Sequence, residues 1–184
     1  MMTVELTQAG IDAALPRVKK GLDSYVWLQA KHVITDVRAD VDFRRRFNGF
    51  YKVRRNQAWQ AVFYDLLERG KSRSTTFADT LAELQHRTGR CEASFASKLV
   101  ATLDPTLPVI DAFVLQNVGM RLPPAGRADR VAATVDVHHR LADTLGACLK
   151  TTNGRYLVRA FDRAYPEAGI TDMKKLDLVL WQTR

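Results

Sequence analysis

The chain has 184 residues, of which 46% are hydrophobic and 26% charged, a composition typical of a folded domain and not of a disordered or fibrous protein. Its formal net charge is +8 at pH 7, and this excess favours a polyanionic partner without requiring one. No apolar run approaches the roughly 20 residues of a membrane span, and MMTVELTQAG lacks a signal pattern. We therefore expect a cytoplasmic protein with no membrane partner.

Apolar residues recur at helical spacing along the whole chain, and no segment alternates with period two between turn signals. Pro16 suits the first turn of a helix, so the first helix is expected to begin there and to extend to Val33. Further helices are expected around residues 43–51, 59–69, 76–88, 95–103, 110–118, 131–150, 156–165 and 171–181. The predicted fold class is all-α, a single-domain bundle of about nine helices over residues 1–184, with the Pro-rich link 121–130 as the candidate flexible join.

Local signals predict where several of these helices begin and end. Gly70 is expected to follow the third helix as its C′ residue, and Gly89 to follow the fourth. Thr76 and Asp79 have the spacing of a capping box with Asp in place of Glu. The helix after Gly89 should end at Asp104, because a residue that precedes proline disfavours the α region.

The segment 43–64 has no acidic residue and carries six cations, Arg44, Arg45, Arg46, Lys52, Arg54 and Arg55. Such clusters bind phosphate backbones because each contact releases condensed counterions. The aromatic residues between them, Phe43, Phe47 and Phe50, follow the spacing of a buried helical stripe, so we interpret them as core and not as stacking platforms. The cations then form a solvated face, which is either inert or faces DNA.

Asp111 stands at the start of the helix expected over 110–118, after a loop between Pro105 and Pro108. An aspartate there caps the helix by accepting backbone N–H bonds. The same position also holds an ionised carboxylate toward any cleft that lies before the helix. We favour the capping role and keep the chemical role as the alternative.

The order helix, Gly-containing hairpin, helix, loop and Pro-Val-x-Asp at a helix start resembles the helix-hairpin-helix DNA glycosylase superfamily. The matching residues are Leu84, Gly89, Ala93, Pro108, Val109 and Asp111. The resemblance implies that backbone amides of the hairpin hold a DNA phosphate and that Asp111 assists cleavage of the bond between base and sugar. The runs SFASKL and ITDMKKLDLVLW are also similar to an uncharacterised bacterial protein family, which implies no activity.

The chain departs from the superfamily pattern at two places. The usual Gly-x-Gly hairpin is Thr88-Gly89-Arg90 here, and the position of the lysine of bifunctional members holds Cys91. A Schiff-base lyase step is therefore not expected unless Lys98 takes that role, and Lys98 is otherwise expected to be a surface lysine. Cys91, at a helix start, is the remaining candidate nucleophile.

The resemblance thus predicts a DNA-binding protein of DNA repair, a monofunctional base-excising N-glycosylase that flips its target nucleotide and uses Asp111. Its partner would be duplex DNA, held by Gly89, Arg90 and the cations of segment 43–64. The alternative is a non-catalytic helical domain that binds nucleic acid or another protein. The sequence has no P-loop, G-x-S-x-G or H-E-x-x-H motif, and His139 and Asp143 lack a third ligand at helical spacing, so neither a cofactor nor a metal is expected.

Overall fold

The computed structural model describes residues 6–183, and every regular element in that range is an α-helix, which confirms the all-α class. The prediction that the first ten residues form no signal sequence depends in part on residues 1–5, which lie outside the described residues. Within residues 6–183, no helix has both the length and the apolar character needed to cross a bilayer. The helices are α1 (Gln8–Ile34), α2 (Val41–Tyr51), α3 (Gln57–Gly70), α4 (Phe77–Thr88), α5 (Ala93–Leu103), α6 (Ala112–Asn117), α7 (Arg130–Lys150), α8 (Thr152–Ala164) and α9 (Asp172–Leu180).

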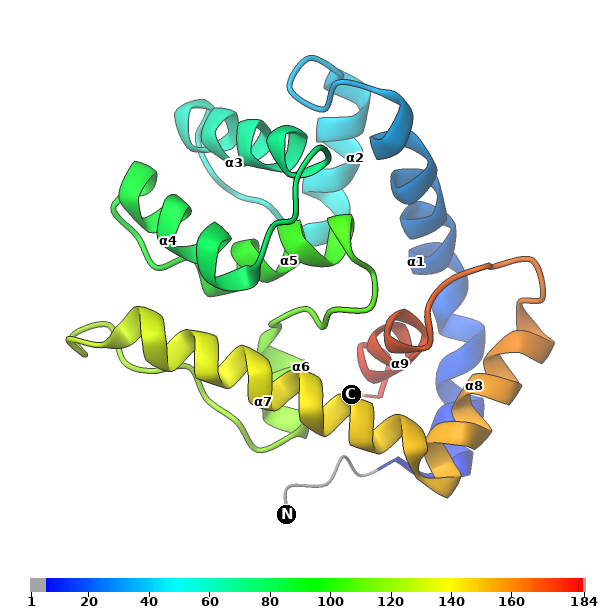
Figure 1. Ribbon diagram of the computed structural model, residues 1–184. Coiled ribbons are helices and arrows are strands. Elements are labelled where there is room, and N and C mark those ends of the chain that lie inside the picture. Colours follow the sequence, from blue (N-terminus) through cyan, green and yellow to red (C-terminus); the bar gives the residue numbers. More distant parts are fainter. Residues whose placement is uncertain (1–5, 184) are drawn as a thin grey trace.

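The last helix, α9, lies in the interior of the molecule (Figure 1) and packs against α1, α6, α7 and α8. Every residue of α9 from Lys174 to Leu180 is buried. The helices α3, α4 and α5 pack on one another beside this group. Contacts of α4 with α7 join the two groups, and α2 packs against α1. The partners of α9 come from both ends of the sequence.

Side-chain caps explain where most of the helices begin. In seven of the described helices, a side-chain oxygen before the first turn accepts a backbone N–H bond, and these caps are Thr7, Asp40, Asn56, Thr76, Asp111, Thr151 and Thr171. Of the two hydrogen bonds of the predicted capping box at α4, one is formed and the other has a different partner. The Thr76 hydroxyl accepts from the Asp79 N–H at 3.1 Å, but it also donates to the Asp79 carboxylate at 2.6 Å, so the carboxylate bonds the hydroxyl and not the Thr76 backbone N–H.

The predicted start of the first helix was wrong. Pro16 lies inside α1, which begins at Gln8 after the Thr7 cap. An interior proline removes one helical hydrogen bond and costs about 3 kcal/mol. Here the turn before it is held by buried Ile11 and Ala14, while Pro16 itself is exposed. Packing of the apolar face therefore outweighs the local penalty.

The predicted role of Gly70 was also wrong. Gly70 is the last residue of α3, and the cap that follows it, Lys71, has a right-handed φ of −66°. A Cβ built on Gly70 would lie 2.4 Å from Leu103 Cδ1, so the glycine permits close packing of α3 against α5. By contrast, Gly89 caps α4 with a φ of 72°, as the sequence predicts.

Phe43 and Phe47 of the basic segment lie in the core, as expected, whereas Phe50 is half-buried and lines a cleft. Phe43 and Phe47 are fully buried, with ring centroids 5.6 Å apart, and Phe47 also contacts Tyr64 at 5.9 Å. Arg45 and Arg46 lie on the exposed face of α2. The α2 part of the segment is thus an amphipathic helix that presents Arg45 and Arg46 to solvent.

Candidate functional site

The residues selected from the sequence divide between two clefts. We call the first, of about 1130 Å³, the Asp111 cleft, and it is lined by Asp111, Lys98, Arg45, Arg46 and Lys52 among others. We call the second, of about 1070 Å³, the hairpin groove, and it is lined by Gly89, Arg90, Cys91 and Arg55 among others. Arg44 and Arg54 line neither cleft.

Asp111 caps α6 and also lines the Asp111 cleft. Its carboxylate accepts the Phe113 N–H at 2.9 Å and so caps α6, which confirms the cap, while the side chain also lines the cleft. The preceding loop is fixed because the buried Ile110 N–H donates to Ser97 Oγ on α5 at 2.8 Å. Ser97 thus holds the Ile110 backbone, next to Asp111, against α5, a role that no local sequence signal indicates.

Lys98 is not the surface lysine that the sequence suggested. It points from α5 toward the cleft, half-buried, and its ammonium group donates to the Tyr51 backbone carbonyl at 3.1 Å. The Phe95 ring centroid lies 5.0 Å from the same nitrogen. Burial lowers the pKa of Lys98, and the carboxylates of Asp111 and Asp177 oppose this effect only in part.

The floor of the Asp111 cleft contains a buried ion pair that sequence reasoning missed. Lys174 Nζ lies 2.5 Å from Asp177 Oδ2, and the two residues are only 6% and 9% exposed. The same ammonium group lies 4.6 Å from the Tyr25 ring centroid and 5.5 Å from that of Phe50. Burial alone would lower the pKa of Lys174, but interactions with its neighbours, chiefly the Asp177 carboxylate, together outweigh it and the pKa is raised. The i, i+3 spacing on a helix is the one signal from which this pair could have been found.

The mouth of the Asp111 cleft is cationic. We call its five side chains from α1, α2 and the α2 C-cap the basic rim, which consists of Arg17, Lys20, Arg45, Arg46 and Lys52. Arg45 and Arg46 both pair with the exposed Asp42, and such exposed pairs contribute little binding energy. The Arg46 guanidinium also stacks on Trp27, 4.2 Å from the ring centroid. Further aromatic lining comes from Phe113 and Trp181, whose centroids are 6.5 Å apart.

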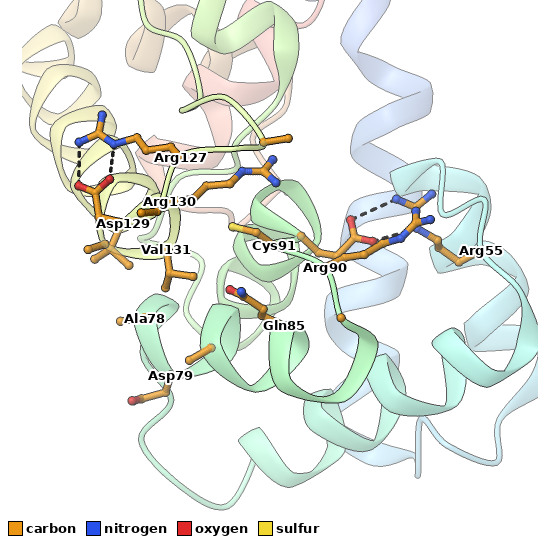
Figure 2. A pocket seen from close by; sticks show the side chains of 17 residues that line it. Arg55, Ala78, Asp79, Gln85, Arg90, Cys91, Arg127, Asp129, Arg130 and Val131 are labelled. Carbon is orange, nitrogen blue, oxygen red and sulfur yellow. Dashed lines mark hydrogen bonds and ion pairs between the residues drawn. The ribbon is translucent and has the colours of Figure 1, made fainter.

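The hairpin groove holds a different set of groups (Figure 2). At one end Arg55 pairs with the buried Glu92 through two nitrogens, at 3.1 and 3.2 Å, and at the other Arg127 pairs with Asp129. Arg130 extends between these pairs toward the start of α5, where Cys91 lies half-buried with its sulfur 3.8 Å from Thr134 Oγ1. The Arg55 guanidinium is therefore committed to a protein carboxylate.

The tertiary structure thus places Cys91 and Asp111 in separate clefts. Four lysines share a cleft with Asp111, and of these Lys98 and Lys174 lie outside the basic rim. In the part of the chain that the structure describes, no group of three or more His, Cys, Asp or Glu residues could hold a metal ion.

No family model matches the chain, and no curated protein or solved structure matches it either. The proposals that follow therefore rest on the residues and geometry of the two clefts.

Proposed function

We propose that this chain binds duplex DNA along the basic rim and receives one nucleotide in the Asp111 cleft. In this proposal it is a helix-hairpin-helix glycosylase-like protein that hydrolyses the bond between base and sugar and has no lyase activity. The observation that carries the proposal is that Asp111, from the α6 cap, lines the same cleft as cations from α1 and α2.

The groups of the cleft suit different parts of a nucleotide. The basic rim would contact phosphates, whose negative charge the five cations neutralise with release of counterions. An extruded base would lie beside the aromatic side chains Phe113 and Trp181, since stacking on such rings compensates for lost base stacking. Neither contact by itself distinguishes one base from another.

Asp111 would act on the sugar. As the bond between C1′ and the base nitrogen breaks, positive charge develops on the sugar, and a fixed carboxylate stabilises it. The carboxylate also orients a water whose oxygen forms the new bond to C1′, while the departing base nitrogen takes up a proton. The Phe113 N–H and the Ser97 contact of Ile110 hold this carboxylate in place before substrate binds.

Lys98 would assist departure of the base. Its ammonium group has three N–H donors, of which one goes to the Tyr51 carbonyl. A remaining donor is available for an acceptor atom on the leaving base. No covalent step through Lys98 is needed for hydrolysis, which agrees with a monofunctional enzyme.

The first test is binding to duplex DNA with and without a stable abasic-site analogue, over a series of salt concentrations. If all five rim cations contact phosphates, the slope of log K against log salt should be about −4.5. The double variant Arg45→Gln/Arg46→Gln should make the slope shallower by about 2. Salt-insensitive or absent binding would contradict the DNA proposal.

The role of Asp111 is tested with Asp111→Asn, because Asn caps a helix about as well as Asp and the fold should be retained. We expect the variant to change the preference for the abasic duplex and, in single-turnover assays over a panel of damaged bases, to slow base release at least about 100-fold. Asp104→Asn is the matched control, since this exposed aspartate lies outside both clefts. Rim-dependent binding that Asp111→Asn leaves unchanged would indicate a non-catalytic DNA-binding domain.

A further inference from the structure

The Asp111 cleft carries more positive than negative charge. Its lining residues include seven cationic side chains, the basic rim with Lys98 and Lys174, against the three carboxylates Asp23, Asp111 and Asp177. Asp177 is paired with Lys174, and Asp23 lies 2.6 Å from Lys19 outside the cleft. Among the described residues Asp111 makes no ion pair, so it is the single carboxylate left to face a ligand.

Three of the aromatic rings that line the cleft, Trp27, Phe50 and Tyr51, are already engaged with protein cations. Aromatic faces attract positively charged ligands, and a cleft that binds such ligands keeps those faces open. Here the Arg46 guanidinium lies 4.2 Å from the centroid of Trp27. Lys174 Nζ lies 5.5 Å from the centroid of Phe50, and Lys98 Nζ lies 5.9 Å from that of Tyr51. A cationic ligand would therefore meet fixed positive charge at each of these three rings.

We propose that the Asp111 cleft selects bases that carry no positive charge and rejects bases made cationic by ring alkylation, with Lys98 as the residue that enforces the selection. This inference rests on the function proposed above and specifies its substrate class. The repulsion acts at Lys98 because that ammonium group is half-buried, where water screens charge poorly. The same group can donate a hydrogen bond to an uncharged base, which needs a donor as it leaves.

The experiment compares two bases of the same shape that differ in charge. N7-methylguanine is cationic, and its 7-deaza-7-methyl analogue is neutral. Each is placed as a single unpaired nucleotide in the same duplex, with fluorine on the sugar to block cleavage, so that neither base has to break a pair. We expect the native protein to bind the neutral analogue about tenfold more tightly than the cation at equal salt.

The variant Lys98→Met keeps the length and apolar contacts of the side chain and removes its charge. It should reduce the tenfold difference to about threefold or less, whereas Lys98→Arg should preserve it. Lys150→Met is the control, because Lys150 is exposed at the end of α7 and lines neither cleft. Retention of the full discrimination in Lys98→Met would overturn the role of Lys98.

The outcomes separate this inference from the function on which it rests. If the abasic duplex is preferred but the cationic base binds as tightly as its neutral analogue, the charge selection is wrong and the proposed DNA site stands. If the abasic duplex is not preferred over intact DNA, the proposed function fails and the inference fails with it.

Discussion

The ion pair of Lys174 and Asp177 beneath the Asp111 cleft makes the variant Lys174→Met a sharp test of the fold. Methionine has nearly the length of lysine and can fill the space among Tyr25, Phe50 and Tyr51, so the substitution removes charge with little change of volume. It leaves the carboxylate of Asp177, a residue that is 9% exposed, without the ammonium group that lies 2.5 Å away.

The expected cost follows from the burial of the pair. Removal of one partner from a buried ion pair typically costs about 3–5 kcal/mol. The Asp177 side chain keeps some contact with water at the cleft, with a side-chain exposure of 12%, so we expect about 4 kcal/mol. The double variant Lys174→Met/Asp177→Leu leaves no uncompensated charge and should lie within about 1 kcal/mol of the native protein.

Urea denaturation followed by circular dichroism measures both values. With a slope of about 2 kcal/mol/M, the midpoint of Lys174→Met should fall by about 2 M. Lys175→Met is the neighbouring control, because Asp162 and Asp172, each 2.8 Å from Lys175, have side chains that are 55% exposed and stay hydrated. Its cost should be about 1 kcal/mol or less. A double variant that costs the sum of its two single substitutions would refute this reasoning.

Two further predictions concern stability. Burial lowers the pKa of His138 to about 4, so the unfolded chain takes up its proton first and stability should fall by up to about 3 kcal/mol as the pH drops from 6.5 to 4. His138→Phe, which keeps a ring stacked on Phe77, should flatten this part of the pH profile of urea stability, and an unchanged profile would contradict the assignment. Gly154→Ala should destabilise by about 1–3 kcal/mol, because its Cβ would lie 2.1 Å from the Cys148 carbonyl oxygen. Gly146→Ala, with no atom within 4 Å of the added Cβ, should instead stabilise by about 0.5–1 kcal/mol, and thermal melts that reverse this order would contradict the packing argument.

The sequence determined most helix boundaries, because their causes are local. Thr76 caps α4, Gly89 ends it in the left-handed conformation, and Asp104 precedes a proline at the end of α5. Each signal acts within one turn of the helix it limits. The two failures, at Pro16 and Gly70, occurred where tertiary packing outweighs the local preference.

The tertiary structure alone decided which cations accompany Asp111. The arginines 44–46 are adjacent on α2 and therefore point in different directions. Arg45 and Arg46 line the Asp111 cleft, whereas the Arg44 guanidinium lies 5.9 Å from the Tyr64 ring centroid and lines neither cleft. Helical periodicity predicts that the three side chains point in different directions. Which of them face the cleft depends on how α2 packs against α1.

Tertiary packing also decided that Lys174 and Asp177, at the floor of the Asp111 cleft, are buried. A stripe of Met173, Leu176 and Val179 predicts a helix with one buried face, and on such a helix Lys174 and Asp177 would be solvated. Because α9 is enclosed by α1, α6, α7 and α8, these charged side chains are buried as well and satisfy one another. The sequence thus specifies the helices through short-range preferences, while burial and charge at the site follow from long-range packing that no local pattern encodes.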